Sequence, residues 1–228
     1  MSNLSSETLF HFTSKLDNLN NILLKGLRYG MFGEKIPGTS QAYFVRGISF
    51  CNIPLSMISE HVDWYGKYAI GLKRSDLREK GATPVMYVHS QTPFLRVADP
   101  VDKLKDNPCF CYMKQFLGYQ MVTKDGKRVP RRKKFYDEKE WRLIKGEHIV
   151  DSYGTVDDLD KKRKGRDETI AEVDPLEVPP DMIEYIILGS PDDLVKFTEF
   201  IDQHDELKSA REEYLTKILY YSQIKKDF

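Results

Sequence analysis

The run IEYIILG, residues 183–189, constrains the fold most strongly, because a stretch this apolar is typical of a strand buried within a sheet. Further strand-like runs lie at residues 9–14, 43–50, 68–72, 84–89 and 135–146. Apolar residues recur at helical spacing over 14–26, 54–66, 93–122, 190–201 and 206–223. Because strands and helices follow no regular alternation, we expect an α+β fold.

The segments between these runs are expected to be loops. Glycine, proline and charged residues dominate residues 30–41, 124–134 and 151–169, and the last of these is expected to be mobile. The tetrapeptide SKLD marks the start of the first helix, with Ser14 as its N-cap and Asp17 at the third position.

The composition fits one soluble domain. The chain has 228 residues, and its 35 Lys and Arg balance 35 Asp and Glu. We expect a single domain over residues 1–228, with 190–228 as a C-terminal helical pair. The N-terminus lacks the basic start and apolar core of a signal peptide, and no run reaches the ~20 apolar residues of a membrane span. A cytoplasmic protein without a membrane partner is therefore predicted.

The three cysteines predict neither disulfides nor a metal site. Cys51, Cys109 and Cys111 form an odd set, which disfavours a disulfide framework. Cys109 and Cys111 make a CxC pair, but no second pair at ligand spacing follows. Because structural zinc usually takes four ligands, we expect reduced, packed thiols.

The segment FYDEKEWRLIKG, residues 135–146, places charges in an apolar and aromatic stretch. If it is one strand, Glu138, Glu140 and Arg142 share a face, because strand side chains alternate. In one interpretation the face is solvated and Arg142 is an ion-pair partner. In the other, a carboxylate stays ionised beside the positive charge that develops when a glycosidic bond breaks.

Residues 124–134 concentrate seven cations against one acid, Asp125. The cations are Lys124, Lys127, Arg128, Arg131, Arg132, Lys133 and Lys134. Such a run is a solvated surface in one interpretation, and in the other it attracts a phosphate backbone. Phe135 and Tyr136 at its end could stack on a base.

His11 is the first candidate for ligand binding. In LFHFT it alternates with the two phenylalanines and shares a strand face with Thr13. It is either a hydrogen-bonded histidine at a sheet rim or a ligand-binding residue. Aromatics near a predicted helix end either form core or offer a face to a flat cationic ring. They are His61, Trp64, Tyr65 and Tyr68.

Three blocks together resemble known families. LFHFTSKLDNLNNILLKGL is similar to the first strand and helix of toxin-like ADP-ribosyltransferases. ISFCNIPLSMISEHVDWYGKYAIGL and YDEKEWRLI resemble the other two blocks of the AbiGi family of abortive phage-resistance proteins. The resemblance spans roughly residues 9–189. It implies a single-domain, split mixed β-sheet core with flanking helices, which holds NAD as a substrate in a central cleft.

The resemblance also implies roles for individual residues. His11 would bind the adenosine-side ribose of NAD, assisted by Thr13, with Phe12 completing the motif. Either Tyr65 or Tyr68 would stack on nicotinamide. Glu140 would hold the nicotinamide ribose and stabilise its positive charge, and Glu138 would engage the acceptor.

These roles predict a phage-defence ADP-ribosyltransferase that modifies a macromolecule, with nucleic acid, RNA in particular, favoured over protein. The acceptor would bind Lys127, Arg128, Arg131, Arg132, Lys133 and Lys134. A cognate antitoxin protein would be a further partner. The alternative is a non-enzymatic antitoxin or regulatory binding module that keeps the transferase-like fold. A third hypothesis is a metal-independent nuclease built on His11, Glu140 and the basic segment.

Overall fold

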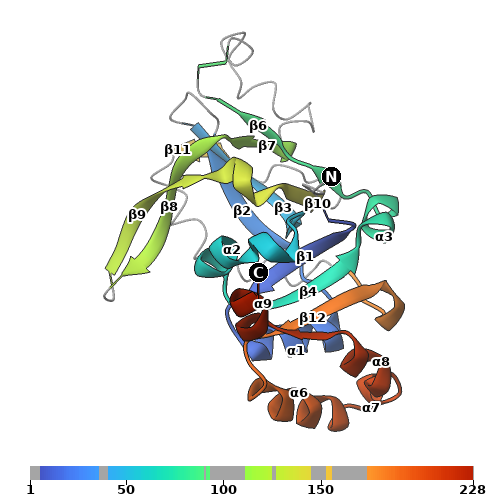
Figure 1. Cartoon of the computed structure of the whole chain (residues 1–228). Coiled ribbons are helices and arrows are strands. Elements are labelled where there is room, and N and C mark those ends of the chain that lie inside the picture. The colour runs from blue at the N-terminus through green and yellow to red at the C-terminus, as the bar shows by residue number, and fades with distance from the viewer. Residues whose placement is uncertain are drawn as a thin grey trace. The chain divides into compact units, whose positions relative to one another are not determined.

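The computed structural model describes residues 6–35, 41–89, 91–92, 111–124, 127–144, 153–155 and 174–227. The chain divides into two compact units. Unit 1 comprises Met1–Arg28, Phe50–Lys80 and Pro175–Phe228, and unit 2 comprises Tyr29–Ser49 and Gly81–Asp174. Within the described residues, every α-helix belongs to unit 1, whereas unit 2 consists mainly of strands (Figure 1).

Unit 1 is built around a mixed sheet in the order β13-β12-β4-β1. Its strands are β1 (Thr8–Thr13), β4 (Tyr68–Lys73), β12 (Ile183–Leu188) and β13 (Ile218–Tyr220). β12 is antiparallel to β4 and parallel to β13, and the end of β3 (Gln41–Cys51) pairs with β1 through Cys51 and Phe10. The predicted strands at 9–14, 68–72 and 183–189 are therefore confirmed.

Helices cover both faces of this sheet (Figure 1). On one face, α2 (Ile58–Tyr65) and α9 (Tyr221–Asp227) contribute Ile58 and Ile224 to a core that contains Phe10 and Phe12. On the other face, α1 (Leu16–Lys25) contacts β1, β4 and α6 (Asp193–Asp202). The apolar periodicity therefore predicted α1, α2 and α6 correctly. The cap at Ser14 was wrong, because Lys15 occupies the N-cap and makes no side-chain cap bond.

Short elements complete unit 1. They are η1 (Leu55–Met57), α3 (Arg74–Glu79), η6 (Pro180–Met182), α7 (Asp205–Lys208) and α8 (Arg211–Thr216). The single helix predicted over 206–223 is wrong, since this region breaks into α7, α8, β13 and the start of α9. β13 pairs with β12, so sheet hydrogen bonds replace helical ones there.

Unit 2 contains the remaining strands. They are β2 (Gly30–Lys35), most of β3, β5 (Thr83–Pro84), β6 (Met86–Val88), β7 (Met113–Gln115), β8 (Leu117–Lys124), β9 (Lys127–Lys134), β10 (Glu140–Ile144) and β11 (Tyr153–Thr155). β2, β11 and β10 pair with β3, and β5 pairs with β10. β6 and β7 form a parallel pair, and β8 and β9 form an antiparallel ribbon, visible as a long hairpin in Figure 1.

Three sequence predictions in unit 2 are corrected. Residues 30–35 form β2 instead of a loop, and the basic segment forms strand β9 instead of a loop. The helix predicted over 93–122 is wrong for residues 111–122, which include β7 and most of β8; residues 93–110 lie outside the described part. A short apolar run fits the helical and the strand period equally well. In unit 2 these segments are strands because they pair with neighbouring strands. Of the predicted loop at 151–169, only 153–155 are described, as β11.

Candidate functional site

The strand that carries Glu140 begins later than its sequence suggests. Residues Phe135–Glu138 form a 3-10 turn, η4, and β10 starts at Glu140. Between them Lys139 adopts a left-handed conformation, with φ 46° and ψ 46°. The prediction that Glu138 and Glu140 share one strand face is therefore wrong. The turn, and not strand alternation, brings both carboxylates to the same cation.

That cation is Lys114 of β7. Its Nζ lies 2.7 Å from Glu138 Oε2 and 2.7 Å from Glu140 Oε2. Glu138 Oε1 in turn lies 2.6 Å from the Nζ of Lys133, which also donates to Gln120 Oε1 at 2.9 Å. Lys133 was predicted to bind an acceptor, but its side chain is buried in this contact.

Arg142 continues the chain of charges from Glu140. Its Nε donates to Glu140 Oε1 at 2.8 Å, and its Nη2 donates to Glu34 of β2. Its Nη1 donates to the carbonyl oxygen of Cys111 at 2.8 Å. The Arg142 side chain is fully buried. The predicted ion pair between Arg142 and the glutamates is thus confirmed for Glu140.

These contacts form an alternating series of buried acids and bases, which we call the charge network. In order it runs Glu34, Arg142, Glu140, Lys114, Glu138 and Lys133. All six residues are buried, which is tolerable for ionised groups only when each is paired and hydrogen-bonded. The network therefore ties together β2, β7, β9, η4 and β10 within unit 2.

The network sets the ionisation of its carboxylates. Burial by itself would raise the pKa of Glu140, but the charges of Lys114 and Arg142 outweigh it and hold that pKa well below its usual range. The same competition, with Lys114 and Lys133, lowers the pKa of Glu138. At Glu34 burial prevails over Arg142 and raises the pKa. Glu140 is therefore the most firmly ionised carboxylate of the three.

Hydrogen bonds fix the position of Glu140 further. Ser49 Oγ donates to Glu140 Oε1 at 2.7 Å, and Arg142 Nη2 lies 3.2 Å from Oε2. The backbone N–H of Glu140 donates to the Tyr87 hydroxyl at 2.7 Å. Burial raises the pKa of this hydroxyl, so it remains protonated at neutral pH. Each oxygen of the Glu140 carboxylate thus accepts two hydrogen bonds from protein groups.

The residues predicted to bind NAD lie in unit 1, whereas both glutamates lie in unit 2. Phe12 is part of the apolar core, and buried Thr13 accepts a hydrogen bond from Asn18 Nδ2 at 2.8 Å. The Tyr68 hydroxyl donates to Asp193 Oδ1 at 3.1 Å. The structure engages these three side chains in packing or hydrogen bonds, and their cofactor role stays a prediction.

His11 and Tyr65 are more accessible than those three residues. The His11 ring lies edge-on to Phe50, with centroids 6.1 Å apart, and Tyr65 packs beside His61 at 4.6 Å. Both are partly buried. His11 and Tyr65 therefore keep a partly open side in unit 1, although no described contact assigns them a ligand.

Comparison with known proteins identifies the family. A family model described as "Putative abortive phage resistance protein AbiGi, antitoxin" matches residues 41–189, well over half of the chain. The chain belongs to the AbiGi family. No curated protein and no solved structure matches it. The match covers β3 through β12 and so includes five of the six residues of the charge network.

Sequence reasoning missed three members of the site in this AbiGi-family chain. Glu34 fell in a predicted loop, Lys114 in a predicted helix, and Ser49 in a strand that was given no role. One signal was available for Lys114, since it is the only charged residue in the apolar run CFCYMKQFLGY. A lone charge in such a run is expected to be paired when it is buried.

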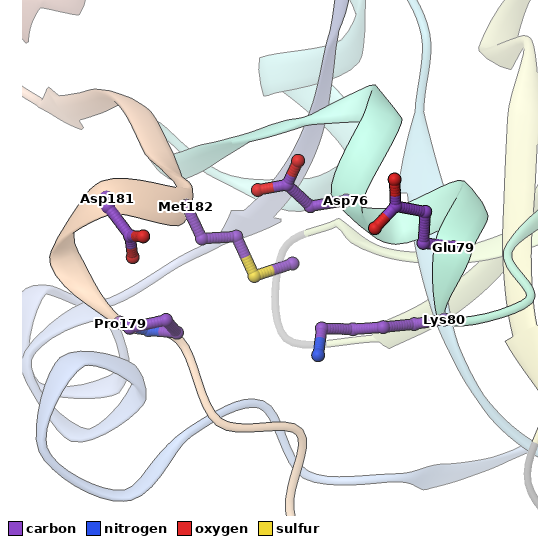
Figure 2. Close-up of a pocket in the computed structure, with 6 residues that line it drawn as sticks. All are labelled: Asp76, Glu79, Lys80, Pro179, Asp181 and Met182. Atoms are coloured by element: carbon purple, nitrogen blue, oxygen red, sulfur yellow. The ribbon is translucent and has the colours of Figure 1, made fainter.

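One remaining surface depression carries no functional assignment. Figure 2 shows an open depression between α3 and η6 of unit 1, lined by Asp76, Glu79, Lys80, Pro179, Asp181 and Met182. Three of its six lining side chains are acidic, and the depression is open to solvent. Among the described residues, no group of acids, histidines and cysteines has the arrangement of a metal site, and no helix has the length and apolar character to cross a membrane.

The cysteines that the structure describes agree with the prediction. Cys51 and Cys111 are buried and not disulfide-bonded. Cys109 lies outside the described residues.

Proposed function

We propose that this AbiGi-family protein acts as a non-enzymatic antitoxin or regulatory binding module of an abortive-infection system. The observation that carries this proposal is the saturation of Glu140. Its two oxygens accept four hydrogen bonds, from Ser49, Lys114 and twice from Arg142. A carboxylate has about four acceptor sites, so little capacity is left for a substrate hydroxyl.

The charge of Glu140 is also neutralised within the protein. Stabilising an oxocarbenium-like state requires negative charge that is not already balanced. Lys114 and Arg142 supply two cations at hydrogen-bond distance. The description of the family as an antitoxin supports the same function. The partner implied by that description is a cognate toxin.

Two measurements on the full chain test this proposal. Titration calorimetry with NAD should give no saturable binding, because a binding module has no need of this ligand. Expression of the chain alone should leave the growth of the host unchanged. Saturable NAD binding together with growth arrest would contradict the proposal. Met57→Ala, a change at an exposed position of unit 1, is the control variant. It should be expressed at the wild-type level and give the same result as the wild-type chain in both measurements.

A second candidate is the ADP-ribosyltransferase that the sequence resemblance implies. The observation in its favour is the low pKa of Glu140, because a carboxylate that is permanently ionised is what a glycosyl transfer requires. In this case Arg142 and Lys114 would position Glu140, and an NAD-induced rearrangement would have to release one of its hydrogen bonds.

Labelled NAD separates the two candidates. The chain is incubated with labelled NAD and host or phage extracts, and nuclease or protease is then added. A transferase leaves label on nucleic acid or protein, and Glu140→Gln abolishes the label while circular dichroism shows a folded protein. Absence of label with the wild-type chain, in extracts from infected and uninfected cells alike, would reject the transferase.

A further inference from the structure

The β8–β9 ribbon presents its large apolar side chains to solvent. Leu117, Tyr119 and Met121 alternate along β8 and are 37%, 70% and 40% exposed. On the opposite face of the ribbon, Gln120 is half-buried and contacts the buried Lys133. A strand with one buried face normally turns its apolar residues inward, so the pattern here is inverted. A contiguous exposed apolar row of this kind marks an interaction site.

Cations lie on the same face of the ribbon. In the β8–β9 register, Leu117 is opposite Lys134, Tyr119 opposite Arg132, and Met121 opposite Pro130. Residues directly opposite in an antiparallel pair share a face. We call these six residues the ribbon face. Arg132 and Lys134 are exposed; Lys134 pairs with Asp137 of η4 at 2.8 Å, and neither β8 nor β9 contains an acidic residue.

Aromatic rings extend this face beyond the end of β9. Tyr136 is 40% exposed, and the Nζ of Lys139 lies 3.5 Å from the centre of its ring. Lys134 Nζ lies 5.6 Å from the Tyr136 ring and 5.9 Å from the Phe116 ring. Phe135, which the sequence also suggested for stacking, is instead buried. Exposed rings and cations thus lie near one another from Tyr119 to Tyr136.

We propose that the ribbon face binds single-stranded nucleic acid. This inference rests on the proposed binding-module function and names nucleic acid as a second class of partner, in addition to the cognate toxin. Exposed rings such as Tyr119 stack on bases of any sequence, while neighbouring cations such as Arg132 pair with phosphates. A duplex hides the faces of its bases, so a single strand fits better. The eight residues of β8 span roughly 27 Å, enough for a few nucleotides.

Fluorescence anisotropy with the full-length protein tests the proposal. The probes are labelled oligouridine and oligothymidine of about twelve nucleotides, within the usual site size of such proteins, and a duplex of equal length. We expect both single strands to bind more tightly than the duplex. With the two phosphate contacts that Arg132 and Lys134 would supply, raising the salt from 50 to 200 mM should weaken binding roughly sevenfold. Comparison of the two single strands shows whether the 2′-hydroxyl contributes.

Two substitutions identify the binding surface. Tyr119→Leu keeps an apolar side chain but removes the ring, and it should weaken single-strand binding about tenfold. Arg132→Ala should weaken binding and reduce the salt slope by about 0.7. Lys127→Ala is the matched control, because Lys127 is exposed on the same strand but lies on the opposite face. It should leave most of the affinity intact.

Several outcomes would overturn the proposal. They are no binding of either single strand, equal affinity for the duplex, or equal losses in the Arg132 and Lys127 variants. Tighter binding of a peptide of alternating Glu and Leu, retained in Tyr119→Leu, would assign the face to an acidic protein instead. None of these outcomes depends on NAD. The anisotropy assay can therefore reject the ribbon proposal while the proposed non-enzymatic function stands. The NAD and growth assays can likewise reject the non-enzymatic function without deciding whether the ribbon face binds a single strand.

Discussion

Replacing Lys114 by Met tests whether the charge network holds unit 2 together. Met has nearly the length of Lys but no charge, so the change removes a cation and little volume. Glu138 and Glu140 would then lose the shared cation that lies 2.7 Å from each. Both glutamates are buried, at 4% and 5% exposure, so water cannot replace the lost partner.

The expected loss of stability follows from that burial. Removal of one partner from a buried ion pair costs about 3–5 kcal/mol, because an uncompensated charge remains. Glu140 keeps Arg142 and Ser49, and Glu138 keeps Lys133, which places the expected loss near the lower end, about 3 kcal/mol. The exposed Lys127→Met is the control and should change the unfolding free energy by less than about 0.5 kcal/mol.

The pH dependence provides an independent check. In the wild type, burial would raise the pKa of Glu138, but Lys114 and Lys133 hold it below its ordinary value. The stability that Glu138 contributes is therefore present above its unfolded pKa of about 4.3 and lost as the pH falls below it. Without Lys114, burial raises this pKa. The loss of unfolding free energy caused by Lys114→Met is then largest near pH 7.5. It becomes smaller toward pH 5, because Glu138 begins to be protonated in the folded variant.

Guanidinium unfolding followed by tryptophan fluorescence measures both effects. The chain has two tryptophans, and in a Trp64→Phe background the signal comes from Trp141 of β10, beside the network. A loss below about 1 kcal/mol at pH 7.5 would refute a structural role for Lys114. A loss equally large at pH 5 and pH 7.5 would show that the unpaired carboxylates are not its cause.

Three further predictions test local features. Gly66→Ala should destabilise far more than Gly81→Ala in thermal unfolding. Both glycines have positive φ, but a Cβ at Gly66 would lie 2.3 Å from Ser14 Cα, whereas nothing lies within 4 Å at Gly81; equal losses would refute the steric argument. Lys139→Gly should be neutral or stabilising, and Lys139→Val should cost about 1–2 kcal/mol in denaturant unfolding, because a branched residue resists the left-handed conformation. Asn20→Leu should raise the unfolding free energy by about 1 kcal/mol, because Asn20 Oδ1 is buried without a hydrogen-bond partner; a loss would show that its amide is needed.

Local patterns in the sequence were sufficient for much of unit 1. The apolar run at 183–189 forms β12, and the segments with helical periodicity at 14–26 and 54–66 contain α1 and α2. These elements pack against each other along one sheet, so burial of an apolar face decides both their type and their orientation. The prediction of a long C-terminal helix is wrong because part of this segment forms β13, which pairs with β12, a strand that is distant in sequence.

Only the tertiary structure decided how the charged residues pair with one another. The sequence identified Glu138, Glu140 and Arg142 as a group and Arg142 as a partner. It could not show that Lys114 lies between the two glutamates, or that Glu34 pairs with Arg142 from 108 residues away. Charge interactions depend on distance and burial, which adjacent residues in the sequence do not determine.

The basic segment, residues 124–134, also separates what the sequence determines from what the tertiary structure determines. Its composition determined a cluster of cations, but strand register determined which of them face solvent. Lys133 turns inward to Glu138, while Arg132 stands beside Tyr119 on the exposed face. Because neighbouring side chains of a strand point to opposite faces, Lys133 completes a buried network and Arg132 is exposed to solvent.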